Sequence, residues 1–239
     1  MTKVKIHLPP YFIKFGKEIY INELINHGIV YFNPLSFFKK IEDDEVRSDN
    51  LEGAVRIEQV KDIKVYHEGK FIAQQLPGSK AQLYFHDPKI KGKVFSLYSI
   101  LNDHLAQDFT FDIRLSKFGD KLLLITHTKK FLDRIIKQIK INNLKFNLGY
   151  VSYYDKSIYS GNLDPFQKPD TFSYQYEFRV FIESSDDFPL KLEIGSIKDI
   201  SQILDVSKLH SIKLVSGSSL TEEQLREIKK ELKRKNKQP

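Results

Sequence analysis

Apolar and polar residues alternate along residues 166–183 with the period of a β-strand. One predicted face is apolar: Tyr174, Tyr176, Phe178, Val180 and Ile182. The other face presents an amide, an acid and a guanidinium: Gln175, Glu177 and Arg179. Such a polar row is typical of a pocket wall. The alternative is a solvent-facing row, in which Glu177 and Arg179 form a surface pair worth at most about 1 kcal/mol.

Further strands are predicted by apolar runs of strand length at 29–32, 54–60, 63–67, 71–76, 81–85, 94–100, 122–126, 146–154, 190–194 and 209–215. The dipeptide Glu68-Gly69 predicts a hairpin turn between two of these runs.

Helices are predicted where the apolar period changes to three or four residues. Residues 17–27 form one such segment, which Gly28 ends. Asn33-Pro34 predicts the start of a second helix, and 111–118 a short third one. Thr128 begins a strongly amphipathic helix. Thr221 and Gln224 have capping-box spacing and predict a basic C-terminal helix.

Together these elements predict an α+β fold with a mixed or largely antiparallel sheet and flanking helices, because helices do not alternate strictly with strands. The chain contains no internal repeat and no long Gly/Pro linker. We therefore expect a single α+β domain at 1–218, followed by a basic helical tail at 219–239.

Composition and charge narrow the class of protein. The chain has 239 residues, 41% of them hydrophobic, and no cysteine, which excludes disulfides, thiolate metal sites and a cysteine nucleophile. No apolar run is long enough to cross a bilayer and no signal-peptide core precedes Pro9, so we expect a cytoplasmic protein without membrane contact. The net charge of +7 favours contact with a polyanion such as RNA or DNA.

The pair Gln175 and Glu177 has a chemical use in cleaving a glycosidic bond. A carboxylate beside the sugar carbon stabilises an oxocarbenium-like transition state. In the nicotinamide–ribose bond of NAD the leaving group is already cationic, so such a site needs orientation and a carboxylate more than an acid. Same-face residues on a strand lie about 7 Å apart, which suits two adjacent groups of one ligand.

The order of short aromatic motifs resembles that of an uncharacterised bacterial and phage protein family. The segments that carry the resemblance are 11–15, Tyr31-Phe32-Asn33-Pro34-Leu35-Ser36-Phe37, 95–98, 149–154, and Lys168 with Tyr174-Gln175-Tyr176-Glu177-Phe178-Arg179. They cover roughly residues 10–183. The same order is similar, more remotely, to the ADP-ribosyltransferase fold, which includes toxins that modify nucleic acid.

The second resemblance implies NAD as co-substrate and assigns roles residue by residue. Glu177 takes the position of the catalytic carboxylate and Gln175 that of the group that positions the acceptor. Lys14 and Ser36 would hold NAD, with Tyr31 as an aromatic wall. Arg179 would pair with a carboxylate or a phosphate. The sequence departs from that pattern at Lys14, where the family has Arg or His, and in lacking Ser-Thr-Ser after the middle strand.

The resemblance further implies a toxin or phage-defence effector that acts on nucleic acid or a nucleic-acid-bound target, with an antitoxin or other protein as a partner. Two alternatives stay open. One is a non-catalytic module that binds nucleic acid or protein through the basic tail. The other is a metal-dependent nuclease, suggested by Pro169-Asp170 followed by Glu177-x-Arg179. The seven histidines lack zinc spacing, and we predict no resident metal.

Overall fold

The structure is a computed structural model that describes residues 7–40, 51–74, 78, 80–87, 91–105, 109–214, 221–223 and 226. It confirms the α+β class and the largely antiparallel sheet. The acidic run 42–45 and most of the predicted tail helix lie outside the described residues. Within the described part of the chain, no helix is long and apolar enough to span a membrane.

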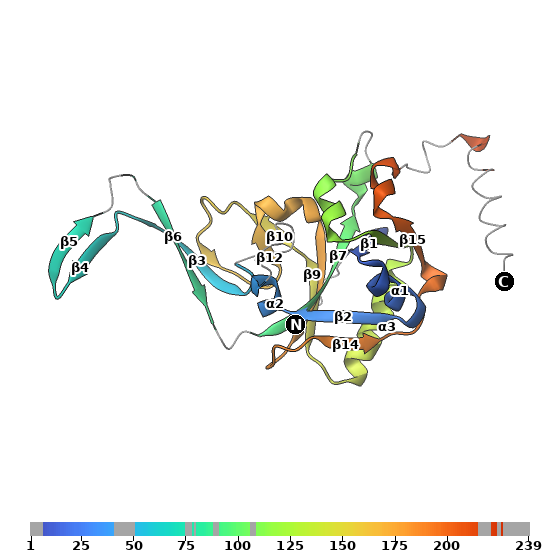
Figure 1. Cartoon of the computed structure of the whole chain (residues 1–239), viewed down its shortest axis with the longest axis horizontal. Coiled ribbons are helices and arrows are strands. Elements are labelled where there is room, and N and C mark those ends of the chain that lie inside the picture. Colours follow the sequence, from blue (N-terminus) through green and yellow to red (C-terminus); the bar gives the residue numbers. More distant parts are fainter. Residues whose placement is uncertain are drawn as a thin grey trace.

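The body is built on one eight-stranded sheet (Figure 1). Its strand order is β14 (Leu190–Glu193), β2 (Ile29–Pro34), β7 (Gly92–Ile100), β1 (Tyr11–Gly16), β8 (Lys121–Ile125) and β15 (Ser201–Asp205), with β13 (Glu177–Glu183) pairing both β7 and β9 (Phe146–Tyr150). All of these pairs are antiparallel.

Along one edge of β7 the sheet divides, because two different strands, β2 and β1, pair with different parts of that edge. On one side β7 pairs with β13 from Gly92 to Tyr98. On the other side it pairs with β2 only at residues 93 and 94, and with β1 only at residues 98 to 100. β2 and β1 therefore diverge along that edge, and residues 95–97 of β7 lie in the gap between them. A gap of this kind exposes main-chain polar groups and opens space for side chains.

Each face of the sheet has its own apolar core, as the alternation within its strands requires. Phe12 and Leu123 point to one face, where the long helix α3 (Thr128–Ile141) packs through Phe131 and Ile135. Their neighbours point to the other face, which is covered by the 3₁₀ helices η2 (Ile113–Phe118) and η5 (Val206–Ser211).

Helix α1 (Glu18–His27) connects β1 to β2 and ends where the sequence predicts. Gly28 is left-handed, with φ 69°, and its N–H donates to the Leu24 carbonyl at 3.0 Å. A Cβ atom at this position would lie 2.0 Å from the main-chain oxygen of Gly195. Only glycine satisfies both the conformation and the close approach.

An arm extends from the body on the side away from α1 (Figure 1). Its base is the three-stranded sheet of β11 (Gly161–Asn162), β3 (Ala54–Lys61) and β6 (Lys80–His86). Its tip is the hairpin of β4 (Lys64–His67) and β5 (Lys70–Gln74). The predicted turn is confirmed, with Glu68 and Gly69 at φ 48° and 75° between the strands.

The structure corrects the predicted strand at 166–183. Only β12 (Gln167–Pro169) and β13 are strands there; between them lies the 3₁₀ helix η3 (Asp170–Gln175), followed by Tyr176 at φ 38°. β12 pairs in parallel with β10 (Ser152–Tyr154) in a separate two-stranded sheet. Pro169 has no N–H to continue a ladder, and the turn buries Tyr174 in the second core. Gln175 therefore does not share a strand with Glu177.

Three further boundaries differ from prediction. The run 146–154 is broken at Val151 into β9 and β10. The strand predicted at 209–215 is wrong, because the 3₁₀ helix η5 begins at Val206 and includes Leu209. Val206 and Leu209 are three residues apart, so this helix buries both side chains on one side. Among the described residues, the last strand is β15, directly before η5. The helix expected from Asn33 begins at Leu35 as α2 (Leu35–Lys40), because β2 continues to Pro34.

Candidate functional site

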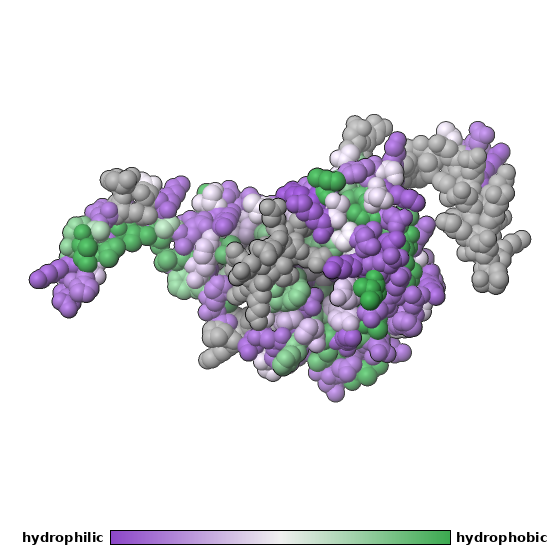
Figure 2. Space-filling view, viewed as in Figure 1, coloured by the Kyte–Doolittle hydropathy of each residue, from purple (hydrophilic) through white to green (hydrophobic). Residues whose placement is uncertain are grey.

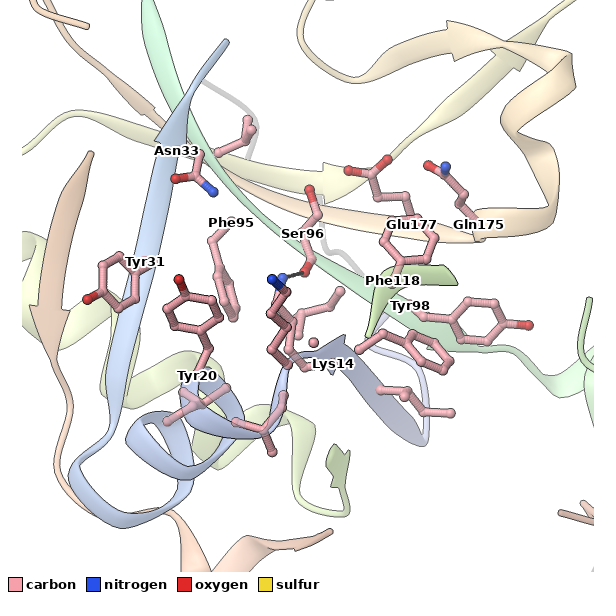
Figure 3. A pocket seen from close by; sticks show the side chains of 18 of the residues that line it. Lys14, Tyr20, Tyr31, Asn33, Phe95, Ser96, Tyr98, Phe118, Gln175 and Glu177 are labelled. Atoms are coloured by element: carbon pink, nitrogen blue, oxygen red, sulfur yellow. Dashed lines mark hydrogen bonds between the residues drawn. The ribbon is translucent and has the colours of Figure 1, made fainter. Parts of the chain in front are cut away.

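A cavity of about 500 Å³ occupies the gap between β1 and β2 (Figure 3). Side chains from several elements line it: Lys14, Tyr20, Tyr31, Asn33, Phe95, Ser96, Tyr98, Phe118, Lys168, Gln175 and Glu177. The volume lies in the range of ligand-binding pockets, and the composition, aromatic walls with a few converging polar groups, is typical of them.

Four of the six predicted site residues line this cavity: Lys14, Tyr31, Gln175 and Glu177. They come from β1, β2, η3 and β13, and the first and the last of them, Lys14 and Glu177, are 163 positions apart along the chain. Ser36 and Arg179 do not line it. Ser36 lies on α2, and Arg179 is buried behind the cavity wall with 1% of its surface exposed. Their roles as ligand-holding residues stay predictions.

Glu177 is a buried carboxylate at the first residue of β13, with 6% of its surface exposed. Its Oε1 accepts from Arg179 Nε at 2.7 Å, and its Oε2 lies 2.9 Å from Lys168 Nζ. Burial by itself would raise the pKa of Glu177, but the charges of Arg179 and Lys168 outweigh burial and hold that pKa far below its ordinary value. Glu177 is therefore ionised. Because both Glu177 and Arg179 are buried, they do not form the surface pair considered from the sequence.

Arg179 connects Glu177 to a second buried acid. Its Nη1 and Nη2 donate to the two carboxylate oxygens of Glu52 at 2.8 and 2.7 Å, a bidentate arrangement. Nη1 also donates to the Pro165 carbonyl. Glu52 is 4% exposed and lies just before β3. The arginine thus fixes the carboxylate of Glu177 from behind and leaves the cavity side to other groups.

Lys168 lies on β12 and lines the cavity. It donates to Gln175 Oε1 at 3.1 Å and is buried, with 7% exposed. Gln175 in turn donates to the Tyr174 hydroxyl at 3.3 Å. The 3₁₀ turn therefore places Gln175 next to Glu177 through a shared lysine, although the predicted strand that would have joined them does not exist.

Lys14 lies in the divided part of the sheet (Figure 3). Its Nζ donates to the Ser96 carbonyl at 2.8 Å, an acceptor in the stretch of β7 that neither β1 nor β2 pairs. The ammonium also lies 4.7 Å from the centre of the Phe95 ring. Tyr20 and Tyr31 form an aromatic pair further along the cavity, with ring centres 6.2 Å apart.

The charged, polar and aromatic side chains are arranged in order along the cavity. Glu177 and Gln175 stand at one end, Lys14 lies near the middle, and Tyr20 and Tyr31 form the other end (Figure 3). Lys17 also lines it, so the lining holds three lysines against one carboxylate. This arrangement suits an anionic ligand that carries planar rings and a hydroxylated group for Glu177.

Sequence reasoning missed Glu52 and did not assign a role to Lys168, Ser96, Asn33 or Tyr20. A lone Glu before Gly53 carries no local signal, because its importance comes from Arg179, 127 positions later. Lys168 is part of a motif of the resemblance, but its burial against Glu177 depends on the turn at 170–175.

The nuclease alternative is not favoured by the geometry. Asp170 is exposed at the start of η3, whereas Glu177 is buried and paired with two cations. Among the described residues, no cluster of three or more His, Asp or Glu side chains is arranged to hold a metal ion.

Comparisons with protein-family models, with curated proteins and with solved structures find no match to this chain. The class defined here is therefore structural: an α+β protein whose divided antiparallel sheet encloses a pocket with an ionised, buried carboxylate.

Proposed function

We propose that the cavity binds NAD and that the protein is an ADP-ribosyltransferase-like enzyme. One observation carries this proposal: Lys14, Tyr31, Gln175 and Glu177, which the resemblance to that fold assigns to the NAD site, line a single cavity. Lys14 and Tyr31 lie more than 140 positions before Gln175 and Glu177, so no local sequence requires the two pairs to meet.

The reaction breaks the bond between the nicotinamide nitrogen and the ribose carbon. The bonding electron pair leaves with nicotinamide, which becomes neutral, and positive charge develops on the ribose. A nucleophile of the acceptor then bonds to that carbon and loses its proton to solvent or to the acceptor's surroundings. Glu177 stays ionised throughout, because Arg179 and Lys168 hold its pKa low. Its role is to accept a ribose hydroxyl hydrogen bond and to stabilise the developing positive charge.

The other lining residues orient the two substrates. Lys14 would neutralise a phosphate, since its positively charged side chain lines the cavity. Tyr20 and Tyr31 offer ring surfaces for a base. Gln175, held by Lys168, would position the acceptor next to Glu177.

The biological setting belongs to the same proposal. The resemblance supports a toxin or phage-defence effector, with nucleic acid as the acceptor and an antitoxin or other protein as a partner. The net charge of +7 supports a polyanionic acceptor. The absence of cysteine from the sequence supports a cytoplasmic setting.

The first test measures nicotinamide release from NAD by the wild type, by Glu177→Gln and by Glu193→Gln. Glu193 is the matched control, because it is an exposed glutamate at the end of β14. We expect Glu177→Gln to lose at least about 100-fold in rate and the control to lose none. Release that is equal in Glu177→Gln and wild type would overturn the assignment.

A second variant separates chemistry from folding, because Glu177→Gln also leaves Lys168 with a weaker buried partner. Lys14→Met changes a half-buried residue at the cavity wall and keeps the apolar stem. We expect it to weaken NAD binding in calorimetric titration, with an unchanged circular dichroism spectrum. Binding of NAD without any release, in the presence of RNA and DNA acceptors, would favour the non-catalytic binding module.

A further inference from the structure

The arm has one bare face, and this feature is independent of the cavity. In the β3–β6 register, Val60 pairs with Ala81, Glu58 with Leu83 and Arg56 with Phe85. Cross-strand partners share a face, so these residues form one face of the ribbon. We call it the arm strip and define it as Arg56, Glu58, Val60, Ala81, Leu83 and Phe85.

The opposite face of the same ribbon is already covered by the body. Ile57 is fully buried there. Gln59 Nε2 donates to the carbonyls of Lys156 and Tyr159 at 3.1 and 2.8 Å, and Gln82 also donates to Lys156. No described element covers the arm strip in the same way, and Leu83 and Phe85 are 46% and 42% exposed. A ribbon that is covered on one face and apolar on the other lacks a partner.

The apolar surface continues to the tip of the arm, as Figure 2 shows. Tyr66, Phe71 and Ile72 are each more than half exposed. With Leu83 and Phe85 they present apolar surface on the order of 500 Å², taking about 150–250 Å² for a whole aromatic side chain. A patch of that size is comparable to the largest apolar patch of a typical monomeric protein, and such a patch is often an interaction site.

We propose that two copies of this chain form a dimer in which the arm strips, together with the exposed Tyr66, Phe71 and Ile72 at the arm tips, pack face to face. Three observations favour a second copy as the occupant. The strip is nearly neutral, because its one arginine and one glutamate form an ion pair with each other. The strip therefore does not repel an identical strip, and it does not require a charged partner. The arm extends away from the body, so its tip is accessible to a second arm (Figure 1).

The apolar area of the arm also favours a second copy of the chain as the partner. A closed two-fold pair buries the same patch twice, so about 500 Å² from each arm gives a total on the order of 1,000 Å². That total stands at the lower limit for specific interfaces, and it predicts a concentration-dependent dimer rather than a permanent one. Two sheets that pack this way lie about 10 Å apart, which an apolar layer of Leu83 and Phe85 side chains would fill.

The first experiment is sedimentation velocity over a range of protein concentrations. We expect the wild type to shift from monomer to dimer as concentration rises, and Leu83→Lys and Phe85→Lys to remain monomeric. Ile141→Lys is the matched control, because Ile141 is an apolar residue at the end of α3 on the body and, at 60%, is even more exposed than Leu83 and Phe85. A wild type that stays monomeric throughout would overturn the proposal, as would a dimer that survives both arm variants.

The second experiment uses the absence of cysteine from the chain. Leu83→Cys places a single thiol on the arm strip, and a bismaleimide with a spacer of about 10 Å should join two copies. Ile141→Cys should give no joined product. If the arm instead binds nucleic acid, the wild type would stay monomeric and a single-stranded oligonucleotide would bind in a salt-dependent way that Lys64→Gln and Lys70→Gln weaken. That result would overturn the dimer proposal and favour a nucleic-acid-binding arm.

Discussion

At the scale of single residues, four charged side chains beside the cavity form a closed network. Glu52, Glu177, Lys168 and Arg179 carry two negative and two positive charges, and each is less than 10% exposed. Burying four charges is costly, and only their mutual pairing offsets that cost. The network therefore constrains which single substitutions the fold tolerates, and it explains why Glu177 is held in place so rigidly.

Glu52→Gln should destabilise the fold by about 3 kcal/mol, because it leaves the guanidinium of Arg179 with one carboxylate instead of two. The measurement is urea denaturation at neutral pH. Asp133→Asn is the control, since it makes the same chemical change in an exposed pair with Lys129 on α3 and should cost less than about 1 kcal/mol. Equal losses in the two variants would contradict a buried network.

The pH dependence of stability follows from Glu177. Its pKa in the folded protein is lowered, so its contribution is fully present above the unfolded-state pKa of about 4.3 and is lost as the pH falls below that value. We expect the urea midpoint to fall steeply from about pH 5 to pH 3. In Glu177→Gln the same titration should be shallower. An identical slope in wild type and variant would show that other carboxyl groups dominate.

At the scale of elements, the unit β1–α1–β2 decides where the cavity opens. β1 and β2 contact β7 at different residues, and α1 spans the distance between them. The turn from α1 into β2 at Gly28 sets the direction of β2, and Gly28 is packed against the backbone of Gly195. The position of Tyr31 on the cavity wall therefore depends on this turn.

Gly28→Ala should lower the free energy of unfolding through two effects: the strain of a left-handed alanine, and the collision of its Cβ with the backbone of Gly195. Gly69→Ala is the matched control, because Gly69 has nearly the same φ, 75°, and no atom within 4 Å of its would-be Cβ. We expect about 1 kcal/mol for Gly69→Ala and clearly more for Gly28→Ala, measured by thermal unfolding. If both variants lose the same stability, the contact with Gly195 is looser than the structure shows.

Elements with strong local signals were predicted correctly. The apolar stripe of α3 predicted a helix from Thr128, and Phe131, Leu132, Ile135 and Ile139 are buried by it. Gly28 ended α1, and Glu68-Gly69 formed the hairpin turn. The alternation at 166–176 was misleading because tyrosine and phenylalanine every second residue suit both a strand and a 3₁₀ turn that packs aromatic rings into a core.

At the scale of the whole molecule, the body and the arm differ in how they are stabilised. The body holds two apolar cores on the two faces of its sheet. In the β4–β5 hairpin, by contrast, every residue is exposed. An isolated two-stranded hairpin has little stability of its own, so the arm gains most from a partner. The dimer proposed above would supply that partner without involving the cavity.

The sequence by itself determined the fold class and most helices and strands, because periodicity and turn chemistry act over a few neighbouring positions. The choice of Lys14 and Tyr31 as site residues came from the resemblance in motif order and stays a prediction. The tertiary structure alone decided three other matters: the division of the sheet at β7, the burial of Glu177 between two cations, and the separation of Arg179 from the cavity. Each depends on residues far apart in the chain meeting across the sheet, as Glu52 meets Arg179, and no local pattern encodes such a contact.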